Sequence, residues 1–188
     1  MSRHKPNKPR RERPAPERDS VWVESDVTSD GVYVVAVRYG MDCVRSLNRS
    51  EAYDHAGAVL AAAQRAEHDC AVARQLMKIT GLALDEVALM IRELRADRPP
   101  LDAAALAPLW LEPGINQETR PFLVLHADGQ QVGQWTVGDA RQHALYVLEA
   151  LEAADLDAAY LRYLVGKIGI DDNRARQAIG DLANYRQR

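Results

Sequence analysis

Two histidines and two aspartates are the residues whose types and spacing come nearest to a reactive site in this sequence. His55 and His143 are 88 positions apart, and Asp69 and Asp157 are separated by the same interval. Imidazole and carboxylate groups together build metal sites and general acid–base pairs. Within one helix, however, the 14 residues from a histidine to the next aspartate span about 21 Å. Structural polar pairs are therefore the favoured interpretation, and a metal-binding or enzymatic site at these positions is the least favoured alternative.

No other catalytic or cofactor-binding motif stands in the sequence. A glycine-rich phosphate loop, a Cys-x-x-Cys pair, a His-Glu-x-x-His motif and a Gly-x-Ser-x-Gly motif are all missing. Cys70 falls on an alanine-rich helical face, where a small core residue is more probable than a nucleophile. Trp22 and Trp110 hold equivalent positions and are expected to be core aromatics. We therefore expect a protein that is not an enzyme and that binds no cofactor.

The elements that would position these residues occur twice. Residues 21–98 align with residues 109–186 without a gap, and 18 of the 78 aligned pairs are identical, against about five expected by chance. Such self-similarity indicates a tandem repeat. The expected organisation is a disordered basic tail (1–19), repeat unit 1 (20–98), a proline-bounded linker (99–108) and repeat unit 2 (109–188).

Each unit is expected to begin with three short strands. Apolar and β-branched runs cover residues 21–24, 32–38 and 43–47 in unit 1, and residues 109–112, 120–126 and 131–135 in unit 2. Asp128-Gly129 is a hairpin signal between the last two runs. The expected fold is α+β: two tandem units related by pseudo-twofold symmetry, each a three-stranded antiparallel meander followed by a long and a short helix.

The boundaries of the long helices are set by capping residues. Asn48 with Glu51, and Thr136 with Asp139, place an N-cap acceptor three residues before an acid. No proline interrupts residues 49–79 or 137–167, and Gly81 and Gly169 fit the left-handed position that ends a helix.

A shorter helix is expected from about residue 85 to 97 and from about 172 to 186. The apolar residues of the first copy fall on one helical face; they are Val87, Met90, Ile91 and Leu94. The helix–Gly81–helix arrangement resembles a helix-turn-helix motif, but the second helix is acidic. A plain helical hairpin is therefore favoured.

A stripe of small residues runs along each long helix and indicates that the two helices pack on each other. If they cross antiparallel near Ala62 and Ala150, His55 comes to lie opposite Asp157, and His143 opposite Asp69. We therefore predict these two histidine–aspartate pairs as structural contacts that fix the helix register.

The first 19 residues differ in composition from the rest. Seven basic residues oppose three acidic ones and give this segment a net charge of +4, so the whole-chain charge of −3 leaves −7 for the remainder. The basic residues are Arg3, Lys5, Lys8, Arg10, Arg11, Arg13 and Arg18. With four prolines and little apolar surface, the segment is expected to be disordered. A nucleic-acid-binding accessory function through this tail is the alternative to a protein-interaction function.

Composition and a family resemblance complete the prediction. The sequence has 47% hydrophobic and 27% charged residues, which is typical of a globular protein, and it has no apolar stretch of membrane-spanning length. Runs such as Trp-Leu-Glu-Pro-Gly at 110–114, Gln-Gln-Val-Gly-Gln-Trp at 130–135 and Asp-Ala-Arg-Gln-His-Ala-Leu at 139–145 resemble tandem-repeat proteins of actinobacteria, their plasmids or their phages. This resemblance covers the chain from about residue 20 and implies a host but no activity. We expect a cytoplasmic, non-enzymatic interaction or regulatory module that binds a protein partner or itself.

Overall fold

The fold was derived from a computed structural model that describes residues 21–40, 42–107, 109–127 and 129–186. The first half contains β1 (Val21–Val27), β2 (Tyr33–Tyr39), β3 (Asp42–Leu47), α1 (Arg49–Thr80) and α2 (Leu84–Ala96). A short helix α3 (Ala103–Leu106) lies in the expected linker. The second half contains β4 (Leu109–Ile115), β5 (Pro121–Ala127), β6 (Gln130–Thr136), α4 (Val137–Tyr163), a π-helical turn η1 (Leu164–Ile168) and α5 (Asp172–Arg186). The predicted tail and its seven basic residues lie outside the described residues.

The strands form two separate three-stranded antiparallel sheets, in the orders β1-β2-β3 and β4-β5-β6. Val21 pairs with Tyr39 in the first sheet, and Leu109 pairs with Ala127 in the second, so the two registers match after a shift of 88 residues. A register irregularity follows Val37 in β2 and the corresponding residue of β5. The predicted α+β class and the two meanders are confirmed.

The predicted capping residues lie at the ends of the two long helical segments. The Asn48 side chain accepts from the backbone N–H of Glu51, whose carboxylate accepts from the Asn48 N–H. Thr136 and Asp139 form the same capping box at the start of α4. Gly81 and Gly169 have φ values of 70° and 77°, a conformation in which a Cβ would be strained.

The short helix α2 buries a narrower face than its apolar pattern predicts. Val87 and Ile91 are buried, but Met90 and Leu94 are exposed. The reason is that α2 packs mainly against α1, with Ile115 of β4 beside the contact, so one row of side chains suffices to make it. Val87 and Ile91 join Ala73 of α1 in a small cluster at this end of the molecule.

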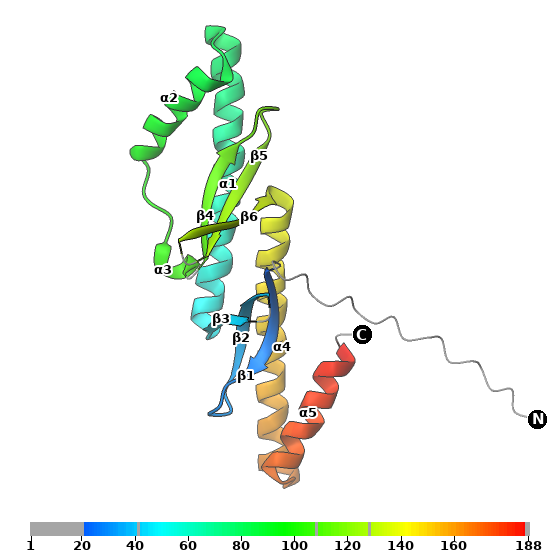
Figure 1. The fold of residues 1–188 in the computed structure, drawn as a ribbon. Helices are drawn as coiled ribbons and strands as arrows, with labels where there is room; N and C mark the ends of the chain where they lie inside the picture. The colour runs from blue at the N-terminus through cyan, green and yellow to red at the C-terminus, as the bar shows by residue number, and fades with distance from the viewer. Residues whose placement is uncertain (1–20, 41, 108, 128, 187–188) are drawn as a thin grey trace, which may run out of the picture.

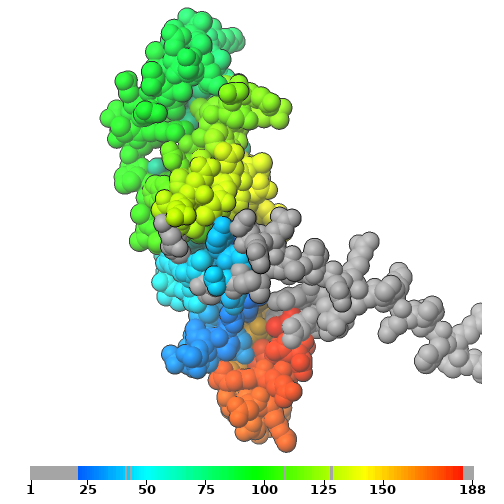
Figure 2. Space-filling view, viewed as in Figure 1, coloured from blue at the N-terminus to red at the C-terminus, as the bar shows by residue number. Residues whose placement is uncertain are grey.

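Each sheet packs mainly on the long helix of the other half. Strands β1 and β2 lie against α4, whereas β4 and β5 lie against α1 (Figure 1). Along the long axis of the molecule, Figure 2 shows the first helical hairpin, then the second sheet, the first sheet and finally the second hairpin. The halves are therefore interleaved, and residues from both contribute to a single large hydrophobic cluster.

The hairpin turn of each sheet is attached to a helix of the opposite half. The Thr119 carbonyl, in the β4–β5 turn, accepts hydrogen bonds from Arg74 Nε and Nη2 and from the Cys70 Sγ–H of α1. In the β1–β2 turn, the Gly31 carbonyl accepts from Arg176 Nη1 of α5 at 3.1 Å. Burial raises the pKa of the Cys70 thiol, with Arg74 acting in the opposite direction, so the thiol form that donates to Thr119 is favoured.

Helices α1 and α4 run antiparallel with small residues between them, as predicted (Figure 1). Ala52, Ala56, Ala62 and Ala66 of α1 are buried in this contact region, as are their alanine counterparts on α4. Two ion pairs cross the seam, Arg49–Asp155 and Arg141–Glu67. Among the described residues, no helix combines the length and the apolar character needed to cross a membrane.

Candidate functional site

His55 and His143 meet in the centre of the molecule. Their Nε2 atoms are 3.2 Å apart, and their ring planes are inclined by 72°. Both side chains are buried, and the Trp135 ring lies 4.9 Å from the His143 ring, centre to centre. The repeat therefore brings its two histidines to each other instead of to the aspartates.

The hydrogen bonds of this pair determine its tautomers. His55 Nδ1 is 2.9 Å from the Ala105 carbonyl oxygen, which only accepts, so Nδ1 carries the proton. His55 Nε2 is then unprotonated and accepts a hydrogen bond from the Nε2–H of His143. With both rings neutral, His55 therefore carries its proton on Nδ1 and His143 carries its proton on Nε2.

Burial lowers the pKa of both imidazoles. Burial and then the neighbouring His55 lower the pKa of His143 to about 3. Burial also lowers the pKa of His55, with the hydrogen bond to Ala105 opposing the effect and Arg45 adding to it. The neutral forms of both rings are therefore favoured near neutral pH.

Acidification is expected to unfold the protein through this pair. An unfolded histidine has a pKa of about 6.5, so protons bind preferentially to the unfolded chain. The stabilisation is complete above about pH 6.5 and is lost as the pH falls towards 3. At pH 4.5, His143 alone should account for a loss of about 2–3 kcal/mol. The free energy of unfolding, measured with urea between pH 7 and 4.5, checks this expectation.

A glutamine at position 143 provides the comparison, because its amide N–H can donate to His55 without titrating. The free energy of unfolding of His143→Gln should fall less steeply with decreasing pH than that of the parent protein. The difference in slope should correspond to about one fewer proton taken up on unfolding. His68→Gln, at an exposed position of α1, should leave the slope unchanged. Parallel pH profiles for the parent and His143→Gln would show that His143 does not titrate with unfolding.

The predicted pairs His55–Asp157 and His143–Asp69 are wrong. The hydrogen-bonding partners of His55 are Ala105 and His143, and the partners of Asp69 are two arginines. The ion pairs Arg49–Asp155 and Arg141–Glu67 show why, because they place residue 157 level with the start of α1. The helices are antiparallel as expected, but their register differs from the predicted one: Asp155 lies opposite Arg49, where a crossing at Ala62 and Ala150 would place residue 163.

Asp69 is a buried carboxylate held by two cations. Its side chain is 1% exposed and accepts from Arg95 Nε at 2.6 Å and from Arg98 Nη1. Arg95 lies in the last turn of α2 and Arg98 lies just beyond it, so the contact ties α2 back onto α1. A buried charge requires such compensation, because an unpaired carboxylate would carry the full cost of its desolvation.

Asp157 occupies the corresponding place in the second half. It is buried and lines a hollow of about 260 Å³ between α4, α5 and the β1–β2 hairpin, together with Tyr33 and Arg176. Burial and then the Asp157 charge raise the pKa of Tyr33. Arg176 is engaged by Asp172 and by the Gly31 carbonyl. The cation that lines this hollow, Arg176, is therefore already paired within the chain.

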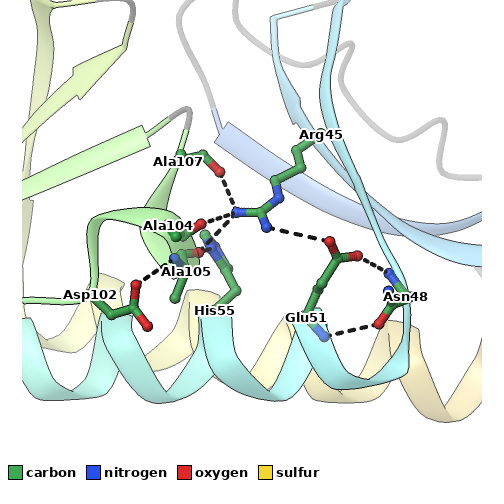
Figure 3. A network of polar contacts seen from close by, with 8 residues as sticks. All are labelled: Arg45, Asn48, Glu51, His55, Asp102, Ala104, Ala105 and Ala107. Atoms are coloured by element: carbon green, nitrogen blue, oxygen red, sulfur yellow. Dashed lines mark hydrogen bonds and ion pairs between the residues drawn. The ribbon is translucent and has the colours of Figure 1, made fainter.

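The linker between the halves is attached close to the histidine pair (Figure 3). Arg45 Nη1 donates to the carbonyl oxygens of Ala104, Ala105 and Ala107, at 2.8, 3.1 and 2.6 Å. Glu51, besides its role in the helix cap, lies 3.7 Å from Arg45 Nη2. These contacts fix the C-terminal end of α3 and the Ala105 carbonyl that His55 requires.

A second hollow, of about 180 Å³, surrounds Asp69 and is rich in arginine. We call it the arginine hollow. It is lined by Arg65 and Asp69 of α1, Arg95 and Arg98 at the end of α2, the following Pro99, Pro100 and Leu101, and Trp110 and Pro113 of β4. Three guanidinium groups face one carboxylate there. Among the described residues, no ion pair or hydrogen bond engages the side chain of Arg65.

Trp110 in this hollow differs from its counterpart Trp22. The ring of Trp22 is covered by Arg38 at 5.5 Å, and its Nε1–H donates to the Gly40 carbonyl at 2.8 Å. Trp110 pairs across the sheet with His126, where Trp22 has Arg38. It is 38% exposed and makes no such contact within the described part of the chain. The expectation that Trp110 is a core aromatic is therefore wrong.

Both hollows are small, and neither has, among the described residues, the side chains to hold a metal ion. Both are smaller than the 300–1,000 Å³ typical of small-molecule sites. Across the described ranges, no three histidine, cysteine, aspartate or glutamate side chains are close enough together to hold a metal ion. The arrangement suits recognition of a single side chain or anionic group.

No protein-family model matches the chain, and no curated protein or solved structure is significantly similar to it.

Proposed function

We propose that the protein is a non-enzymatic protein-interaction module whose binding site is the arginine hollow. The observation that carries this proposal is the composition of the hollow: three guanidinium groups, one buried carboxylate and an exposed tryptophan around an apolar floor. Arginine and tryptophan are the residues most enriched among energetically important interface positions. The hollow has room for about one side chain of a partner.

The difference between the two hollows supports this assignment. We propose that the halves are related by pseudo-twofold symmetry, because strand register, helix caps and sheet exchange all correspond after a shift of 88 residues. Under that relation the hollows at Asp69 and Asp157 are equivalent positions. One contains Arg176 with its own partners, whereas the other contains Arg65 with none in the described chain. Of the two hollows, the arginine hollow is thus the one that contains a cation, Arg65, with no counter-ion among the described residues.

A nucleic-acid-binding function through the basic tail remains the alternative. Its seven basic residues lie outside the described residues, and residues 20–188 carry a net charge of −7. This net negative charge repels a nucleic acid, whose binding depends on many contacts between basic side chains and phosphates. The arginine hollow, in contrast, concentrates its positive charge in one small place. We therefore favour a protein partner.

Site-specific photo-crosslinking tests the proposed function. A photoreactive phenylalanine analogue at position 100, an exposed position in the lining of the hollow, should form a covalent adduct with a partner protein in the native host. The same analogue at position 92 is the control, because Arg92 is an exposed residue of α2 outside the hollow. Excess unmodified protein should suppress the adduct, and excess Arg65→Glu protein should not. Equal adducts at both positions, or none at position 100, would contradict the proposal.

A further inference from the structure

We propose that the arginine hollow binds an acidic segment of the partner that carries one apolar, preferably aromatic, side chain. This inference rests on the proposed function and specifies the chemistry of the partner. The apolar side chain would lie on Trp110 and the neighbouring prolines, and flanking carboxylates would pair with Arg65 and Arg95.

The charge balance of the hollow calls for an anion. Asp69 accepts one N–H from Arg95 Nε and one from Arg98 Nη1. Most N–H groups of these two guanidinium groups are therefore not used by Asp69. Arg98 Nη2 is also directed at His68 Nδ1, at 3.3 Å. Three guanidinium groups and one carboxylate leave an excess charge of +2. Arg65, which is half-buried and has no partner in the described residues, would gain most from a carboxylate, because arginine binds carboxylates in a bidentate manner.

The shape and lining of the hollow call for an apolar group beside that anion. Most of its surface is contributed by apolar atoms, and Pro99, Pro100, Leu101 and Pro113 lie around Trp110. A flat tryptophan face that is 38% exposed provides a surface for ring stacking. A volume of about 180 Å³ suits one large side chain and excludes a drug-sized molecule. An ion alone, such as free phosphate, would leave this apolar surface uncovered.

The hollow is also fixed in shape before any partner binds. Arg65, Arg95 and Arg98 belong to the first half, whereas Trp110 and Pro113 belong to the second. The attachment of the β4–β5 turn to Arg74 and Cys70 holds these two sides together. Because little ordering is required on binding, a short peptide should suffice as a ligand.

Fluorescence anisotropy with the full-length protein tests this chemistry. The probe is a fluorescein-labelled ten-residue peptide in which one phenylalanine is flanked on each side by two glutamates. We expect saturable, salt-sensitive binding that is weakened about tenfold by Arg65→Ala. Arg65→Lys should restore part of the affinity, and Arg92→Ala should leave it within twofold. Arg65 is the informative position because no described residue relies on it for an ion pair.

Changes in the probe separate the two parts of the proposal. Replacing the four glutamates by glutamine, or the phenylalanine by serine, should each weaken binding about tenfold. Equal binding of the glutamine peptide, or an effect of Arg65→Ala below twofold, would overturn the inference. Arg65-dependent binding of a ten-nucleotide single-stranded DNA at least as tight as that of the peptide would overturn it as well. A competable adduct at position 100 without this peptide preference would leave the proposed function intact and refute only the acidic–aromatic partner.

Discussion

Expressed separately, residues 20–98 and residues 99–188 are expected to be largely unfolded. In the intact chain, β1 and β2 are covered by α4, and β4 and β5 are covered by α1, so each fragment would expose the apolar face of its sheet to water. A chain of about 80 residues is in any case close to the lower size limit for a stable core. Mixing or co-expressing the fragments should restore a cooperative unfolding transition, measured by circular dichroism during thermal denaturation.

The unbroken chain with a protease-cleavable insertion between Arg98 and Pro99 is the control. After cleavage it should keep its secondary structure, because the interleaved contacts do not depend on the peptide bond that is cut. The opposite result would be two fragments that each unfold cooperatively as monomers, with curves that add to that of the intact protein. The halves would then be independent domains.

Removing both partners of Asp69 is expected to be strongly destabilising. In Arg95→Ala/Arg98→Ala, a carboxylate that is 1% exposed loses both of its arginine ion pairs, and uncompensated burial of this kind costs about 3–5 kcal/mol. Adding Asp69→Ala to the double variant should recover part of that loss, because it removes the uncompensated charge. Urea unfolding at neutral pH measures both effects.

Arg92→Ala is the matched control on the same helix and should change stability by less than about 0.5 kcal/mol. A loss below about 1 kcal/mol in the double variant would mean that Asp69 is reached by water. Failure of Asp69→Ala to recover any stability would indicate that the arginines contribute through packing of their side-chain stems instead of through charge.

Local features of this fold could be predicted from the sequence. The capping boxes at Asn48 and Thr136 and the left-handed glycines at 81 and 169 were expected and are present. They depend on residues within a few positions of one another. The meanders follow from apolar runs separated by turns for the same reason. The helix α3 was missed, although Asp102 followed by three alanines is an N-cap signal.

Long-range features could not be predicted in the same way. Periodicity identifies the apolar face of a helix, but it does not say which sheet covers that face, so the exchange of sheets was not foreseen. The register of α1 against α4 depends on packing along the whole seam, and the observed register brings His55 to His143 in place of the expected histidine–aspartate pairs. The arginine hollow likewise combines Arg65 with Trp110, which are far apart in the chain. The one available signal was that His126 stands opposite Trp110 where Arg38 stands opposite Trp22.

A pair of double-cysteine variants tests the interleaved arrangement most directly, since the arginine hollow exists only if the second sheet lies on α1. In a Cys43→Ser/Cys70→Ser background that keeps Arg74, Ala71→Cys on the exposed side of α1 is combined with either Glu118→Cys or Asp30→Cys. The last two are exposed turn positions 88 residues apart. A short bifunctional maleimide should join position 71 to position 118 within one chain, because the neighbouring Arg74 contacts Thr119, and it should not join position 71 to position 30. Peptide mapping by mass spectrometry identifies the product, and a cross-link from position 71 to position 30 but not to position 118 would show that each sheet covers its own helix.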